Sequence, residues 1–256
     1  MNKGAFAAQK IFNEFGLDDL SEFSVEDLIH ARDIILEEKK IQNADGRIVF
    51  GNNKSKISVN SDIKHSGRRR FTLAHELGHF EMHHNINTQL EDNSLTLDYF
   101  KSGNQEYEAN QFATELLMPQ SSFLNFITGK LFSPALLREI AEHFQTSITS
   151  ATFRYLEIGK HPISVFYSKD KKVIYWKNSP NYFRKVKEIT RLAPPDDSVA
   201  MEFYKAGTIY TKNDSAQEIV KSTWFETKDY DSADAYYEFA IVTKDFNTVL
   251  SVVWED

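Results

Sequence analysis

The stretch Phe71-Thr72-Leu73-Ala74-His75-Glu76-Leu77-Gly78-His79 decides how this sequence is interpreted. It contains the pattern HExxH, in which two histidines stand four residues apart. On an α-helix, positions i and i+4 lie one turn apart on the same face, so both imidazoles can reach one metal ion. Apolar neighbours give the segment one side that suits a core. We therefore expect a helix over about residues 71–84.

The residue that follows the first histidine, Glu76, indicates catalysis rather than a purely structural metal site. Its carboxylate can act as a general base toward an attacking water. Average residue usage produces HExxH by chance in roughly one chain of this length in a hundred. We predict one catalytic Zn²⁺ per chain, with His75 and His79 as ligands and Glu76 as the catalytic residue. Gly78, on the same helix, allows another element to approach closely.

The third metal ligand is predicted to be a carboxylate. A catalytic zinc site needs three protein ligands and an open position, and the chain has no cysteine. His83 extends the histidine face, but a helix rises about 1.5 Å per residue, which separates it from His75 by about 12 Å along the axis. These two histidines cannot bind one ion. The ligand must therefore come from another helix.

That second helix is expected from about Gln105 to Met118. Its apolar stripe consists of Ala109, Phe112, Ala113, Leu116 and Leu117. Glu106 stands three and seven residues before two members of the stripe, which places it on the same inward face. A carboxylate there is costly unless it is paired or metal-bound. We predict Glu106 as the third ligand and keep Glu108, which falls to the side of the stripe, as the alternative.

Together the two segments resemble the ImmA/IrrE family of metallopeptidases. In that family an HExxH helix precedes a helix reading E-x-x-A-x-x-F-A that ends near a proline, here residues 106–113 and Pro119. The resemblance covers about residues 40–120 and continues more loosely to the segments around Trp224 and 250–254. It places the third ligand on Glu106. It implies a regulatory, gluzincin-like endopeptidase that cleaves a helix-turn-helix transcriptional repressor in prophage, mobile-element or stress-response settings.

The residues before the HExxH segment suggest a scaffold of helices and a small antiparallel sheet. A helix is expected from about Gly4 to Phe15, and a capping box formed by Ser24 and Asp27 predicts a second helix that continues to about Lys39. The runs 47–50 and 56–60, with a turn between them, predict a β-hairpin. We expect Lys56–Asn60 to be an edge strand that could pair with an extended substrate.

A helical pair is expected from about Ser133 to Ile158, with Ser133 as the first N-cap and Ser147 as the second. The layout is that of a helix-turn-helix. Between residues 134 and 158 the chain carries two cations against three anions. DNA affinity rests on neutralising phosphates, so this charge balance argues against nucleic-acid binding and favours packing or partner docking.

The remainder of the chain predicts a separate α/β domain with antiparallel strands. Hairpins are expected from residues 163–177 and 236–254. The predicted fold class is therefore α+β: a helical zincin-like metallopeptidase core at residues 1–130, the helix-turn-helix-like pair at 131–160, and a C-terminal regulatory or substrate-docking domain at 161–256. No motif in this last part indicates a ligand.

Composition sets the class of protein and leaves alternatives open. The net charge of -7 argues against a basic nucleic-acid or membrane-surface protein, and no export signal or spanning segment is visible, so we expect a cytoplasmic protein.

Two alternative functions remain: a transcription regulator with a metal-sensing site, and an antitoxin-like binding protein whose site does not turn over. The group that stabilises the oxyanion is undetermined among Tyr107, His83 and His84.

Overall fold

The computed structural model describes residues 2–20, 23–84, 90–93, 104–180, 182–210, 215–228 and 235–255. The chain forms two compact units. The N-terminal unit contains residues 1–126 and 140–147, and the C-terminal unit contains residues 127–139 and 148–256. Both combine helices with a sheet, which confirms the α+β fold class. The predicted division into residues 1–130, 131–160 and 161–256 stays a prediction.

The sheet of the N-terminal unit has the strand order β1-β3-β2-β4. Its strands are β1 (Ile35–Lys39), β2 (Ala44–Val49), β3 (Lys56–Asn60) and β4 (Leu90–Asn93). The predicted hairpin is confirmed, because β2 and β3 pair antiparallel. β1 runs parallel to β3, and β4 antiparallel to β2. Ile48, Ile57 and Val59 are fully buried, since their alternation with polar residues gives the sheet one apolar face.

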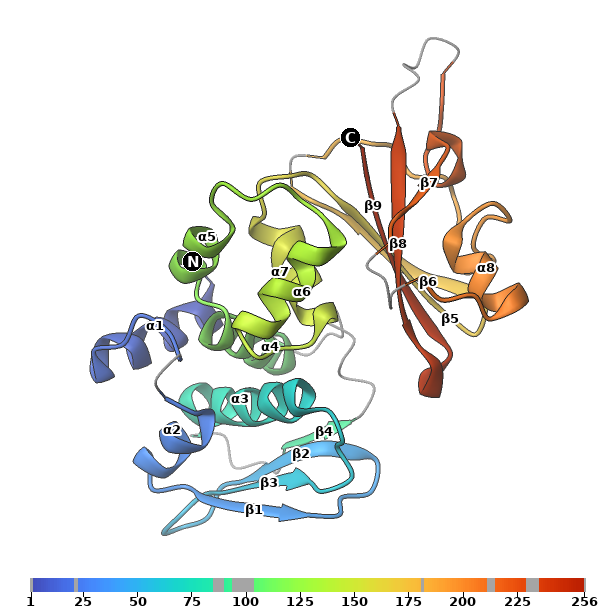
Figure 1. Ribbon diagram of the computed structural model, residues 1–256. Coiled ribbons are helices and arrows are strands. Elements are labelled where there is room, and N and C mark those ends of the chain that lie inside the picture. The colour runs from blue at the N-terminus through green and yellow to red at the C-terminus, as the bar shows by residue number, and fades with distance from the viewer. Residues whose placement is uncertain are drawn as a thin grey trace. The chain divides into compact units, whose positions relative to one another are not determined.

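Helices cover that sheet in successive layers (Figure 1). They are α1 (Lys3–Phe15), α2 (Val25–Ala31), α3 (Ser66–His83), α4 (Asn104–Leu117) and α5 (Gln120–Ile127). α3 contacts β2 and β3 on one side and α4 on the other, and α1 packs on α4. The predicted close approach at Gly78 is present, because a Cβ there would lie 2.8 Å from the Phe112 ring. The HExxH helix is therefore central in this unit.

The prediction of a helix from Ser24 to about Lys39 is wrong for its second half. The capping box is confirmed: Asp27 N donates to Ser24 Oγ over 3.0 Å, and Ser24 N donates to Asp27 Oδ2 over 2.9 Å. α2 nevertheless ends at Ala31, and Asp33 adopts the left-handed conformation with φ 55°. The chain then enters β1, whose backbone pairs with β3 instead of forming helical hydrogen bonds with the residues before it.

The prediction that Lys56–Asn60 is an edge strand is also wrong. β3 lies between β1 and β2, so both of its edges are paired. Among the strands that the structure describes in this sheet, β1 and β4 occupy the edges. The apolar residues of β1 continue the helical spacing of α2, so the sequence does not indicate β1 as the neighbour of β3. An extended peptide therefore cannot pair with β3.

The predicted helical pair is present as α6 (Pro134–His143) and α7 (Ile148–Ile158). Ser133 caps α6, since Leu136 N donates to its Oγ over 3.1 Å. Gln145, with φ 51°, lies in the turn between the helices. The boundary between the two compact units falls inside α6, after Glu139, and α7 belongs to the C-terminal unit.

The C-terminal unit is built on an antiparallel sheet with the order β6-β5-β9-β8-β7. Its strands are β5 (Ser164–Lys169), β6 (Lys172–Asn178), β7 (Gln217–Ile219), β8 (Tyr236–Thr243) and β9 (Thr248–Glu255). Both predicted hairpins are confirmed. α8 (Val199–Ala206) contacts β8 and β9 (Figure 1). Besides α7, the unit also contains the short 3₁₀ helices η2 (Lys221–Thr223) and η3 (Lys244–Phe246).

A buried carboxylate lies at the centre of the C-terminal unit. Glu238 on β8 has no exposed surface. Its Oε1 accepts hydrogen bonds from Ala200 N and Ser251 Oγ, and its Oε2 accepts from Val199 N and Trp224 Nε1, over 2.6–3.1 Å. The carboxylate thereby ties the first turn of α8 to the sheet. Among the described helices of both units, none is long and apolar enough to cross a membrane.

Candidate metal centre

Three side chains from α3 and α4 converge on one point inside the N-terminal unit. One ligand-type atom from each of His75, His79 and Glu106 lies within 4.8 Å of the other two. The Nε2 atoms of the two histidines are 3.0 Å apart, and the Glu106 oxygens lie 3.2 Å and 3.3 Å from them. The structure therefore brings together the three residues that the sequence predicts as ligands.

Each histidine of this group is held by a hydrogen bond on its other ring nitrogen. His75 Nδ1 lies 2.9 Å from Asn110 Oδ1. Asn110 stands one helical turn after Glu106 on α4, so the same face of one helix provides both the carboxylate and the partner of His75. Because Oδ1 only accepts, the proton of His75 is on Nδ1 and its Nε2 carries a lone pair.

His79 is held in the same manner by a second histidine. Its Nδ1 lies 3.1 Å from His83 Nδ1, and His83 Nε2 lies 2.9 Å from Glu108 Oε2. With the proton of His83 on Nε2, where it donates to the carboxylate, His83 Nδ1 accepts from His79 Nδ1. The Nε2 atom of His79 is then also a lone-pair donor toward the centre.

This arrangement fits a cation. Two imidazole lone pairs and a carboxylate face one another within hydrogen-bond distance, and such acceptor atoms repel each other unless positive charge lies between them. Two histidine nitrogens and one carboxylate form the ligand set of the thermolysin type of zinc site. The side chains of His75 and His79 are almost fully buried, and that of Glu106 is 24% exposed.

Electrostatics keep the donor atoms in the protonation states that a metal requires. Burial, supported by the neighbouring His75, lowers the pKa of His79 to about 4, so its imidazole is neutral at neutral pH. Burial by itself raises the pKa of Glu106, but His75 and His79 outweigh it and hold the pKa of that carboxyl well below its usual range. Near pH 7 the imidazole of His79 is therefore neutral and the carboxyl of Glu106 is ionised.

The predicted general base lies on the sheet side of the same helix. Glu76 is buried, and the backbone of β2 passes close to it: a Cβ on Gly46 would lie 2.7 Å from Glu76 Oε1. The next residue back along β2 fixes this approach, because buried Asp45 accepts from Arg68 Nε and Nη2 over 2.6 Å and 2.8 Å. Because Gly46 has no side chain, the Glu76 carboxylate can occupy this space.

The remaining predicted residues do not join the centre. Glu108 binds His83 and Lys3 instead of facing the two HExxH histidines. Tyr107 is 46% exposed. His83 has both ring nitrogens engaged, and His84 lies exposed at the end of α3.

Sequence reasoning missed Asn110 and Gly46. A polar residue four positions after Glu106, on the face that carries the carboxylate, was the available signal for Asn110. A glycine before a strand-like run, which often marks a close approach of backbone, was the signal for Gly46.

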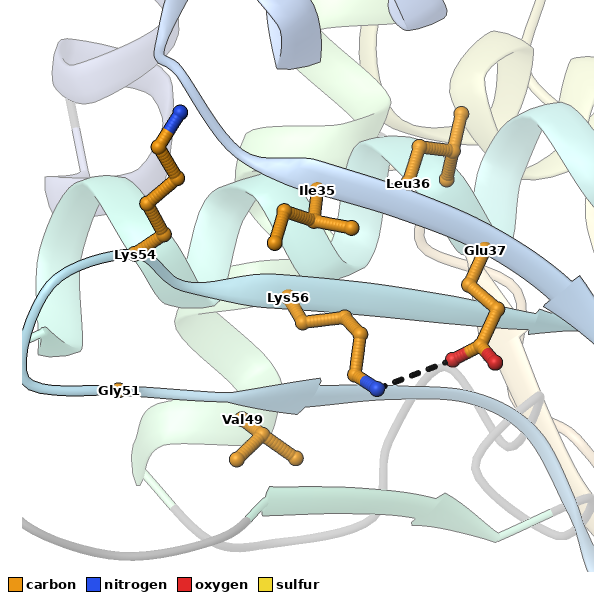
Figure 2. Close-up of a pocket in the computed structure, with 7 residues that line it drawn as sticks. All are labelled: Ile35, Leu36, Glu37, Val49, Gly51, Lys54 and Lys56. Carbon is orange, nitrogen blue, oxygen red and sulfur yellow. Dashed lines mark ion pairs between the residues drawn. The ribbon is translucent and has the colours of Figure 1, made fainter.

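A surface hollow lies elsewhere, on the sheet. A cavity of about 530 Å³ is lined by Ile35, Leu36, Glu37, Val49, Gly51, Lys54 and Lys56. Figure 2 shows that these residues come from β1, the end of β2, β3 and the turn between β2 and β3. Its charges are already paired, Lys56 with Glu37 over 3.2 Å and Lys54 with Asp33 over 2.5 Å. Because no residue of the metal centre lines it, we do not assign it to the chemistry.

A helix that carries HExxH between a sheet and a second, carboxylate-bearing helix defines a zincin-like metallopeptidase domain. Residues 30–156 match the family model for the IrrE N-terminal-like domain, Peptidase_M78, and the chain belongs to this ImmA/IrrE family. A solved structure described as a "Mycobacterium tuberculosis transcriptional regulator" has a TM-score of 0.60 at 13% sequence identity, covering 100% of this chain and 76% of that chain. That likeness concerns the fold alone. A search of curated proteins gives no match.

Proposed function

We propose that this chain is a zinc-dependent endopeptidase of the cytoplasm that cleaves a helix-turn-helix transcriptional repressor. The observation that carries the proposal is the convergence of His75, His79 and Glu106 on one point, with Glu76 buried on the same helix as the two histidines. Membership of a metallopeptidase family supports a peptide-bond hydrolase. The choice of zinc rests on the ligand set, because two imidazoles and one carboxylate are typical of catalytic zinc.

In this proposal the metal ligands and the general base are different residues. His75, His79 and Glu106 hold the ion, which when bound polarises the scissile carbonyl and acidifies water. Glu76 accepts the proton of the attacking water and passes it to the nitrogen of the leaving amine.

The substrate class comes from the family resemblance and from a fold shared with a protein described as a transcriptional regulator. The rival functions are a metal-sensing regulator and an antitoxin-like partner, both without turnover. Residues 134–158 of the helical pair carry two cations, Arg138 and Arg154, against three anions, which favours protein contact over phosphate contact.

The test is incubation with repressors encoded by neighbouring genes, followed by mass spectrometry of the products. The unmodified protein is expected to yield two fragments, whereas E76Q, with one zinc per chain retained, yields none. E81Q is the matched control, because Glu81 lies on the same helix and contacts Arg32. Repressor release without a cut product would support the binding rival, and cleavage by E76Q would contradict the role of Glu76.

A further inference from the structure

A chain of hydrogen bonds leads from the metal centre to the first turn of α1. It begins at His79 Nδ1, passes through both ring nitrogens of His83 to Glu108 Oε2, and ends at Lys3 Nζ, with distances of 3.1, 2.9 and 2.7 Å. His83 is 2% exposed and the Glu108 side chain is 12% exposed. Nothing in the proposed reaction uses His83, Glu108 or Lys3, although a buried carboxylate and a buried imidazole are costly to place.

We infer that His83, held by Glu108 and Lys3, is a positioning residue that fixes the proton of His79 on Nδ1 and so keeps Nε2 available to the metal. This inference rests on the proposed function, since it concerns the ligand role of His79. The carboxylate of Glu108 has no proton to donate, so it accepts from His83 Nε2. In the neutral imidazole of His83, Nδ1 then accepts from His79 Nδ1, so the direction of each hydrogen bond follows from the one before it.

The two histidine ligands are thus held by different means. His75 depends on the amide of Asn110, which lies on α4 next to the ligand Glu106. His79 depends on a chain that involves three helices, α3, α4 and α1. α1 can lie this close to α4 because Gly4 has no side chain: a Cβ there would be 2.3 Å from Glu108 O. Outer partners of this kind orient a metal-bound imidazole, and their loss typically weakens metal affinity about 10- to 100-fold.

The decisive variants change His83 while leaving all three ligands intact. H83A removes the acceptor of His79 Nδ1, which allows the proton to move to Nε2, where it blocks the metal. H83Q offers an amide oxygen to His79 and an amide N–H to Glu108, so it should retain the chain. H84A is the matched control, because His84 is the next residue, exposed, at the end of the same helix. E108A removes the far acceptor without altering the histidine.

Two measurements are needed, zinc affinity by competition with a chelator and the His79 tautomer in the metal-free protein by long-range ¹H–¹⁵N NMR correlation. We expect H83A to bind zinc about 10- to 100-fold more weakly and to populate the Nε2–H tautomer. H83Q and H84A should stay close to the unmodified protein. E108A should show a smaller loss of affinity in the same direction, which keeps the test valid if H83A does not fold.

Each outcome separates this inference from the proposed function. Unchanged zinc affinity and an unchanged tautomer in H83A or E108A would overturn the inference, even if the variants unfold at lower temperature. Absence of zinc binding by the unmodified protein would overturn the proposed function. The tautomer measurement would still decide whether His83 controls His79, because it uses no metal. Equal losses in H84A and H83A would also contradict a specific role for His83.

Discussion

Gly46 determines how much space the Glu76 side chain has. A Cβ at this position would lie 2.7 Å from Glu76 Oε1 and 2.6 Å from Thr72 Cγ2, both closer than ordinary contacts. We expect G46A to displace the carboxylate and lower kcat/KM about tenfold to a hundredfold, because misplacing a catalytic group by an ångström has effects of this size. Zinc content should stay at the level of the unmodified protein, measured by mass spectrometry of the metal.

The double variant G46A/T72S tests which contact matters. Serine lacks Cγ2 but keeps the hydroxyl that donates to Arg68 O, so the double variant removes one clash and leaves the one with Glu76. Activity should therefore remain low in G46A/T72S and normal in T72S alone. Full recovery in the double variant would show that Glu76 is not displaced.

The metal centre could be predicted largely from local spacing. His75 and His79 share a face because four residues make one helical turn, and Glu106 could be placed by its spacing from the apolar residues of α4. The contact between Gly46 and Glu76 could not be predicted, because it joins a strand to a helix some thirty residues later. Local sequence periodicity gives no information about contacts over that separation. The role of His83 was hidden for a similar reason: it lies one turn after His79 on α3, but His83 and Glu108 meet only when α3 packs on α4.

At the scale of elements, the contact between α3 and α4 depends on Gly78. The Phe112 ring fills the space where a Cβ would be, at 2.8 Å. We expect G78A to lower the free energy of unfolding of the N-terminal unit by about 1–3 kcal/mol, the usual cost of overpacking a core. The loss should appear in chemical denaturation of the metal-free protein, and zinc affinity should fall with it because α4 carries Glu106.

The compensating variant for this contact is F112L, which shortens the opposing side chain. In G78A/F112L the two changes should be less destabilising together than the sum of the single changes, since contacting residues are energetically coupled. Strict additivity would show that the clash is relieved elsewhere. The same measurements on F112L alone give the cost of the cavity that the smaller side chain leaves.

The misassigned helix after Ser24 shows where element prediction fails. Leu28 and Ile35 are seven residues apart, and so are Ile29 and Leu36, which continues the helical repeat without a break. No glycine or proline marks the end of α2. The reversal at Asp33, with φ 55°, and the parallel pairing of β1 with β3 depend on contacts distant in sequence. Local periodicity therefore favoured a helix that tertiary pairing replaces with a strand.

At the scale of the whole molecule, the tryptophans give a probe for one of the two units. The chain has three, Trp176, Trp224 and Trp254, and all of them belong to the C-terminal unit. The metal centre lies in the N-terminal unit. Tryptophan fluorescence and zinc affinity therefore report on different units, so a change can be assigned to one unit without separating them.

Glu238 makes the stability of the C-terminal unit depend on pH. Burial raises the pKa of its carboxyl above the ordinary value of 4.5, against the hydrogen bonds from Ser251 and Trp224 that lower it. Between the two values the folded unit binds more protons than the unfolded chain, so stability is highest below the unfolded pKa and is lost as pH rises through the folded pKa. Denaturation followed by tryptophan fluorescence, in a pH series beginning near 4.5, should show this decline.

E238Q should be less stable at every pH and lose this dependence. Its amide nitrogen cannot accept hydrogen bonds, so two of the four donors around it lose their acceptor, at a cost of about 1–3 kcal/mol for a buried group. E218Q is the control, because Glu218 lies exposed on β7 of the same sheet. It should keep both the stability and the pH slope of the unmodified protein. An equal slope in E238Q would assign the pH dependence to other groups, whereas a flat profile in E238Q alone would assign it to this carboxyl.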